Sequence, residues 1–195
     1  MLIPYNQVLG IASFNVPAYS NGNDEYFSGE RNYYQGIFTG FKWQCVEYAR
    51  RWLLIRKTCS FRSIGSAADA WKELTFIERI IDGKKFPLIN HANGSSTLPK
   101  KDSFLIYPRC QDLPFGHIAV IVDVGRDSIS IAEQNYHFRR WHGNSARQIP
   151  IITKNGGYFL KDHYKIDGWM EIIDDHEQLQ PFDETTSDNL RNATR

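Results

Sequence analysis

Residues 41–54 read FKWQCVEYARRWLL, and this stretch places a single cysteine where a helical pattern begins. From Cys45 onward, apolar side chains recur at the spacing of one helix face, at Val46, Ala49, Trp52 and Leu53. The pattern predicts a helix over about 44–56 with Cys45 in its first turn. The first backbone N–H groups of a helix have no internal partner and carry partial positive charge, so they favour a thiolate over a thiol. The stretch therefore predicts an acidified cysteine at the start of a core helix.

The composition around this helix is that of an ordinary globular domain. The chain has 195 residues, 42% of them apolar, which is enough for one sizeable core. Its 23 Lys and Arg nearly balance its 22 Asp and Glu, so charge does not favour a nucleic-acid or membrane partner. The three cysteines, at positions 45, 59 and 110, are odd in number and lack C-x-x-C spacing. We therefore expect neither a zinc site nor a disulfide framework, and no cofactor.

The N-terminal residues do not resemble a targeting segment. They lack a basic region followed by a long apolar run, and no later stretch approaches the length of a membrane span. We expect a cytoplasmic protein, while its oligomeric state is left open.

The pattern along the chain changes from irregular to helical and then to β. Residues 1–40 are rich in Gly, Asn, Ser and aromatic side chains, and predict an irregular N-terminal arm. Helical patterns follow over about 44–56 and 66–80. Short β-rich runs separated by turn residues come next, at 103–107, 117–124, 128–134, 158–161 and 168–173. This order predicts an α+β domain over 1–180, with an N-terminal helical lobe packed on a C-terminal antiparallel β-sheet, and a polar, flexible tail at 181–195.

A nucleophilic thiolate needs a base that takes its proton and an acid that protonates the leaving group, and a histidine does both. His117 begins a predicted strand, where a side chain is held firmly at a sheet margin. The next strand follows a short connection, so the two should form a hairpin. A turn centred on Gly125 places His117 opposite Glu133, and one centred on Arg126 places it opposite Asn135. In either register both polar residues share a face with His117, so one of them can orient the imidazole.

Glu133 is the preferred orienting residue. A carboxylate also stabilises an imidazolium paired with Cys45, whereas the Asn135 amide would only orient the ring. Each of these residues alone has an ordinary structural explanation, as a buried thiol or a satisfied polar group. Together, Cys45, His117 and Glu133 form the constellation of a thiol hydrolase.

Three blocks of sequence resemble the signature blocks of the CHAP amidases, the cysteine, histidine-dependent amidohydrolase/peptidase family. They are KWQCVEYARR at 42–51, GHIAVI at 116–121 and AEQN at 132–135. Further matches lie at 16–21, 40–42, 93–95 and 168–170. The resemblance extends from about residue 8 to about residue 173, and it is strongest to the amidase domains that accompany glutathionylspermidine and trypanothione synthetases.

This resemblance implies a papain-like α+β fold related to the NlpC/P60 group. It implies a cysteine amidase that releases glutathione and spermidine from their conjugate through a cysteinyl thioester. It also implies roles for six residues: Cys45 as nucleophile, His117 as general base and acid, Glu133 as the orienting member, Gln44 in the oxyanion site beside the Cys45 N–H, and Arg50 and Asn135 in the substrate cleft.

Other functions remain open at this point. Much of the wider CHAP group resembles peptidoglycan amidases and endopeptidases, and the sequence shows no signal peptide or wall-binding repeat that would deliver such an enzyme. Hydrolysis of a protein isopeptide or another amide is a further alternative, as is a catalytically inactive binding module. The expected partner is a small-molecule or peptide amide, with a thiol-polyamine conjugate favoured. In the two-function relatives a ligase domain follows, and no synthetase activity is assigned to this chain.

Overall fold

The computed structural model describes residues 1–183 and residue 186, so most of the tail predicted at 181–195 lies outside the described residues. Helix α1 spans Cys45–Lys57 and α2 spans Ala70–Glu73, with 3-10 turns at Ser13–Asn15 and Ala67–Asp69. The remaining elements are strands: β1 (Val8–Ala12), β2 (Val16–Tyr19), β3 (Arg31–Tyr34), β4 (Ile37–Phe41), β5 (Cys59–Ser60), β6 (Phe76–Arg79), β7 (Lys85–Ala92), β8 (Phe104–Tyr107), β9 (His117–Val124), β10 (Ser128–Ala132), β11 (Arg147–Lys154), β12 (Gly157–Leu160) and β13 (Gly168–Ile172).

These strands form one large sheet and two small ones. The large sheet has nine strands in the order β12-β11-β10-β9-β8-β13-β7-β6-β5, and the small sheets are the hairpins β1-β2 and β3-β4. The neighbouring strands pair antiparallel throughout. The described chain is therefore mostly β, with two helices and a large antiparallel sheet. The predicted sheet is confirmed, while the helical lobe is reduced to one long helix and one short one.

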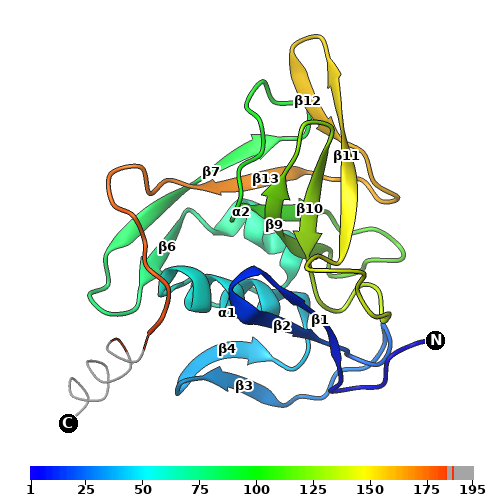
Figure 1. Cartoon of the computed structure of the whole chain (residues 1–195), viewed down its shortest axis with the longest axis vertical. Coiled ribbons are helices and arrows are strands. Elements are labelled where there is room, and N and C mark those ends of the chain that lie inside the picture. The colour runs from blue at the N-terminus through cyan, green and yellow to red at the C-terminus, as the bar shows by residue number, and fades with distance from the viewer. Residues whose placement is uncertain (184–185, 187–195) are drawn as a thin grey trace.

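Helix α1 lies between the large sheet and the two N-terminal hairpins (Figure 1). It packs against β9 and β5 of the sheet and against β2 and β4 of the hairpins. The predicted apolar face meets the core, where Trp52 and Leu53 are fully buried, and burial of a leucine side chain contributes about 1.5–3 kcal/mol. The opposite, polar face is buried as well, because the hairpins cover it. Glu47, Arg50 and Arg51 are all at most 4% exposed.

Both faces of the central strands are covered, which explains their continuous apolar character. On β9, Ile118 and Val120 join the apolar cluster that contains Trp52 of α1. The alternate residues Ala119 and Ile121 join a second cluster on the opposite face of the sheet. His117 begins this strand, and so it belongs to the face of Ala119.

Two sequence expectations were wrong in their local structure. The helix expected over 66–80 is instead a 3-10 turn and α2, followed by strand β6. The apolar spacing predicted a helix because Leu74 and Ile77 would be buried in a helix or in a strand. Pairing of β6 with β5 and β7 makes this segment a strand. Residues 1–40 are more regular than the expected arm, because they contain both small hairpins. The Gly- and Asn-rich signals there mark the connections between strands.

Gly116 fixes the point at which β9 begins. Its φ of 65° lies in the left-handed region, and a Cβ there would lie 2.5 Å from the Tyr107 carbonyl oxygen and 2.6 Å from the Ala68 Cβ. Only glycine fits this backbone without displacing its neighbours. His117 follows directly, paired opposite Tyr107 of β8. In the part of the chain that is described, neither helix is long and apolar enough to cross a membrane.

Candidate active site

Cys45 is the first residue of α1, as the sequence predicted. Gln44 precedes it as an extended N-cap residue whose side chain makes no capping bond. The first N–H groups of the helix therefore keep their partial positive charge for the thiol and for a ligand beside it. Cys45 is half-buried, whereas Cys59 is buried and Cys110 is exposed. The structure thus leaves one cysteine that is both accessible and next to a histidine.

His117 links Cys45 to Glu133. The Nε2 atom of His117 lies 2.9 Å from Oε2 of Glu133, and both side chains are at most 3% exposed. The imidazole also acts on the Cys45 thiol, since its hydrogen bond and charge hold the pKa of the thiol below its ordinary value. Because Nε2 is engaged by the carboxylate, Nδ1 is the ring nitrogen left to face the sulfur. The three side chains thus form one interacting series, with His117 in the middle.

The hairpin that joins His117 and Glu133 follows neither predicted register completely. Near the turn, Ile129 pairs with Val124, but a bulge shifts the register so that Ala132 pairs with Val120. This second part matches the register expected for a turn centred on Arg126. Strand β10 ends at Ala132, and continuing its pairing places Glu133 diagonally from His117. The long glutamate side chain spans that diagonal.

The electrostatics favour an ion pair between the thiol and the imidazole. Burial alone would raise the pKa of Cys45, but the hydrogen bond and charge of His117, together with the N–H groups of Ile118 and Val46, hold it below its ordinary value. Burial opposes the charged form of His117, yet its bonds to Cys45 and Glu133 raise its pKa to about 9. At neutral pH both shifts favour a thiolate beside an imidazolium.

Glu133 remains ionised in this buried place. Burial would raise its pKa, but the hydrogen bond from His117 and the charge of Arg147 lower it to about 2. A buried carboxylate needs such partners, because a single unpaired charge would be strongly destabilising. Glu133 therefore supplies a full negative charge to the imidazolium.

The amide of Gln44 is held in one orientation. Its Oε1 atom accepts a hydrogen bond of 3.0 Å from Nδ2 of Asn135, while its Nε2 atom makes only a long contact of 3.4 Å with Oδ1 of Asn21. Asn135 has a left-handed backbone, with φ of 58°. Its Oδ1 atom is buried and has no hydrogen-bond partner among the described residues. The structure thus brings Gln44 and Asn135 together next to Cys45.

Arg50 lies apart from this group. Its guanidinium donates to the carbonyl oxygens of Thr39 and Arg62 and lies 4.8 Å from the Phe61 ring centroid. Among the contacts of the described residues, none joins Arg50 to Cys45, His117 or Glu133. Its place in a substrate cleft stays a prediction.

A buried polar network holds the start of α1 against the segment that carries Glu133. Glu47 accepts hydrogen bonds from Arg51 at 2.7 Å and from Thr39 at 2.9 Å. Gln134 donates to Glu47 at 3.0 Å and accepts from the Tyr19 backbone N–H at 2.8 Å. This network holds the start of α1, which carries Cys45, against Gln134, the residue next to Glu133. Sequence reasoning missed it because its members come from four separate segments.

Sequence reasoning also missed the residues behind Glu133. Arg147 donates to Glu133 through Nε at 2.7 Å and through Nη2 at 3.3 Å. The same guanidinium donates to Oδ2 of Asp162 at 2.5 Å and to the Tyr107 hydroxyl at 3.1 Å. The available signal was the pairing of β10 with β11, which places Arg147 opposite Ile131, two residues before Glu133.

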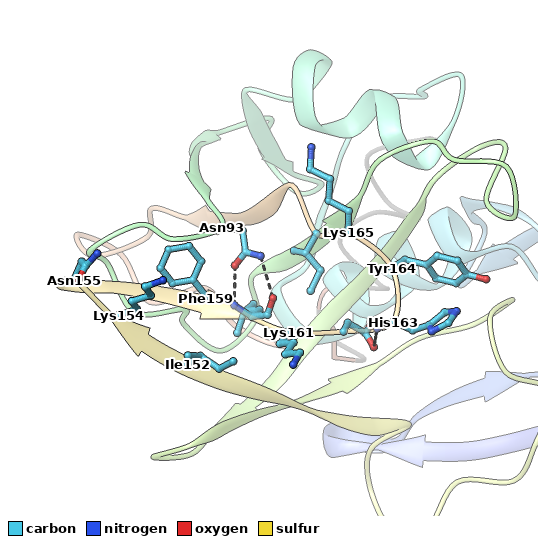
Figure 2. A pocket seen from close by; sticks show the side chains of 12 residues that line it. Asn93, Ile152, Lys154, Asn155, Phe159, Lys161, His163, Tyr164 and Lys165 are labelled. Carbon is cyan, nitrogen blue, oxygen red and sulfur yellow. Dashed lines mark hydrogen bonds between the residues drawn. The ribbon is translucent and has the colours of Figure 1, made fainter.

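A groove of about 580 Å³ lies beside β11 and β12, next to the residues behind Glu133 (Figure 2). Asp162, His163, Tyr164 and Lys161 contribute to its lining, while Cys45, His117 and Glu133 do not. No group of three or more His, Cys, Asp and Glu side chains in the described part of the chain is arranged to hold a metal ion.

The site has the arrangement of a cysteine hydrolase: a thiol at a helix start, a histidine at a strand start, and a carboxylate that orients the histidine. The family comparison agrees with this class. The CHAP domain matches residues 36–135, which include Cys45, His117 and Glu133. The chain belongs to the CHAP domain family, and this family suggests a cysteine amidohydrolase.

Three relatives indicate which members of the family this chain is similar to. Trypanothione synthetase of Crithidia fasciculata is 37% identical over 160 residues, covering 82% of this chain and 24% of that protein. The bifunctional glutathionylspermidine synthetase/amidase of Escherichia coli is 30% identical over 201 residues, covering 96% and 32%. Glutathionylspermidine synthase of Crithidia fasciculata is 27% identical, covering 87% and 27%. The chain thus spans 24% to 32% of the length of these relatives, and it is similar to their amidase region.

Proposed function

We propose that this protein is a cysteine amidase that hydrolyses the amide between the glycine carboxyl of glutathione and spermidine. The series Cys45, His117 and Glu133 carries the proposal, since it supplies a nucleophile, a proton carrier and a fixed negative charge. The substrate is drawn from the relatives, one of which is a bifunctional glutathionylspermidine synthetase/amidase. We also propose that the helix-on-sheet arrangement is papain-like, as in the CHAP family.

Acylation begins with the ion pair already formed. The Cys45 thiolate attacks the glycyl carbonyl carbon, and the developing oxyanion is stabilised by the Cys45 backbone N–H and the Gln44 side chain. As the C–N bond breaks, His117 gives its proton to the leaving spermidine nitrogen. The products of this step are a glutathionyl thioester of Cys45 and the free amine.

Deacylation restores the enzyme with water. Neutral His117 takes a proton from a water molecule, whose oxygen attacks the thioester carbonyl. The C–S bond breaks, glutathione leaves with a free glycine carboxylate, and the thiolate pairs again with protonated His117. Throughout the cycle Glu133 holds the ring, so that Nδ1 stays directed at the sulfur and at the reacting groups.

Product analysis tests the substrate directly. The purified protein should release glutathione and spermidine in equal amounts from their conjugate, as measured by mass spectrometry. In ¹⁸O-labelled water, one ¹⁸O atom should enter the glycine carboxyl per turnover. Muropeptides and polyamine-modified peptides should be incubated in parallel, with Cys45→Ala as the blank. Cleavage of either of those substrates without cleavage of the conjugate would contradict the proposal.

Replacing Gln44 by alanine should slow acylation without unfolding the protein. The change removes one donor to the oxyanion, which typically costs roughly 2.7–4 kcal/mol, or about 100- to 1,000-fold in kcat. Because Gln44 makes no capping bond, the helix start should remain intact. Steady-state kinetics and thermal unfolding check both parts, with Gln148→Ala on the exposed side of β11 as the matched control. An unchanged kcat would contradict the assignment of Gln44 to the oxyanion site.

A further inference from the structure

Arg147 and Asp162 form a charged pair directly behind the proposed catalytic carboxylate. Arg147 binds both oxygens of Glu133, at 2.7 Å through Nε and 3.3 Å through Nη2. On its other side the same guanidinium binds Asp162 at 2.5 Å. The Tyr107 hydroxyl closes the group, because it donates to Asp162 at 2.6 Å and accepts from Arg147 at 3.1 Å. Arg147 is thus shared between two carboxylates.

The pair is well buried and comes from separate elements. The side chain of Arg147 is 17% exposed and that of Asp162 is 11% exposed. Arg147 begins β11, whereas Asp162 follows β12 and forms part of the wall of the groove beside the labelled Lys161 and His163 (Figure 2). The guanidinium also lies 4.4 Å from the ring centroid of Tyr136, whose ring is 4.8 Å from that of His117. The arrangement places Arg147 in a fixed position behind the imidazole.

Several titratable groups pack around Glu133 in addition to His117, and only two of them carry charge near neutral pH. The groups are Tyr48 on α1, Tyr107 on β8, Tyr136 and His137 after β10, Arg147 on β11 and Asp162 after β12. Burial raises the pKa of each of the three tyrosines, and burial lowers the pKa of His137, so all four are neutral. The buried Glu47 carboxylate is matched by Arg51. The net charge behind Glu133 is therefore set by Arg147 and Asp162.

We propose that Arg147 is a positioning residue that holds Glu133 against His117, and that Asp162, by offsetting the charge of the guanidinium, sets how strongly the charged pair behind Glu133 stabilises the Cys45 thiolate. The inference rests on the proposed roles of Cys45 and His117 in hydrolysis, but not on the identity of the amide. Its physical basis is charge: Arg147 places a positive charge behind Glu133 that stabilises the thiolate, and Asp162 places beside it a negative charge that opposes this effect.

The two charges should act on the thiol with opposite signs. Arg147→Gln removes a positive charge near the site, so the thiolate is less stable and the apparent pKa of Cys45 should rise by about 0.5–1 unit. Asp162→Asn removes a negative charge, so the same pKa should fall by a similar amount. Arg147→Lys keeps the charge and should give a profile near that of the unchanged protein, although it loses the two-pronged contact with Glu133.

The test is the pH dependence of Cys45 alkylation by iodoacetamide in the whole protein, followed on the Cys45 peptide by mass spectrometry. Peptide analysis separates Cys45 from the exposed Cys110. Arg126→Gln is the matched control, because this exposed arginine lies in the turn of the β9–β10 hairpin, at the end remote from His117. Thermal unfolding of each variant is recorded alongside.

Opposite shifts for Arg147→Gln and Asp162→Asn support the proposal. A purely structural role would loosen the site in both variants and move both profiles upward, so an upward or absent shift in Asp162→Asn overturns it. If Arg147→Gln does not fold, the direction of the Asp162→Asn shift alone decides. Alkylation requires no amide substrate, so opposite shifts without cleavage of the conjugate would reject the proposed substrate and leave this inference standing. Cleavage of the conjugate without those shifts would support the proposed substrate and overturn this inference.

Discussion

Replacing Cys45 by alanine is expected to abolish amide hydrolysis while leaving the fold unchanged. Removing the nucleophile of a hydrolase that works through a covalent intermediate costs on the order of 10⁶-fold in kcat. Cys45 is half-buried at the first position of α1, and alanine is the best helix former, so the helix should persist. Loss of hydrolysis, with an unchanged unfolding midpoint, is the expected result of kinetics and thermal melting on the same preparation.

The alanine variant also reports on the ion pair. The Cys45 side chain is one of the groups that raise the pKa of His117 to about 9, so this pKa should fall when the thiol is removed. An NMR titration of the His117 ring measures the change. Cys110→Ala is the matched control, because this exposed cysteine lies outside the series of Cys45, His117 and Glu133. Hydrolysis by the Cys45 variant at the unchanged rate would exclude the thioester mechanism.

Replacing Glu133 by glutamine is the second change expected to have a large effect. Glu133 accepts from both His117 and Arg147, whereas a glutamine presents an NH₂ group to one of these two donors. The imidazolium loses its fixed negative charge, so the pKa of His117 should fall and less thiolate form at neutral pH. By analogy with other catalytic triads, in which the acid-to-amide change lowers kcat by about 10⁴-fold, activity should nearly disappear.

The same change should alter stability and its dependence on pH. Arg147 keeps only Asp162 as a charged partner, and breaking a buried ion pair costs about 3 kcal/mol or more. The pKa of Glu133 is about 2 in the folded protein against an ordinary 4.5, so its stabilisation is complete above pH 4.5 and is lost as the pH falls toward 2. Urea unfolding at several pH values should show this loss in the unchanged protein and a flatter curve in Glu133→Gln. Glu78→Gln, at an exposed position on β6, serves as control, and equal acid sensitivity in the two variants would reject the assigned pKa.

The sequence predicted the parts of this site that depend on local patterns. The spacing of Ala49, Trp52 and Leu53 predicted α1 almost to the residue, because these side chains do face the core. Strand β9 was predicted with its observed ends, since Gly116 stops the preceding segment and the apolar run follows at once. Local order was therefore enough to place both Cys45 and His117.

The remaining features depend on contacts between distant segments. The bulge that sets the position of Glu133 lies within β9, where every residue from His117 to Val122 is apolar or buried and no turn signal marks it. The contact of Arg147 with Glu133 depends on the pairing of β10 with β11, and the sequence pattern did not predict this pairing. The prediction of a helix over 66–80 was wrong for a related reason. Burial of Ile77 fits either a helix or a strand until β7 is placed beside it.

The network around Glu47 has a consequence for folding. Its hydrogen bond between Tyr19 and Gln134 joins positions 115 residues apart, and Gln134 also reaches Glu47 across 87 residues. Such long-range contacts close only after the intervening chain has been ordered, because loop closure costs entropy before they form. A growing chain that has not yet added Gln134 also lacks a placed Glu133, so its Cys45 keeps the ordinary acidity of a free thiol. The reactive thiolate thus arises only after the segment that carries Glu133 and Gln134 has docked.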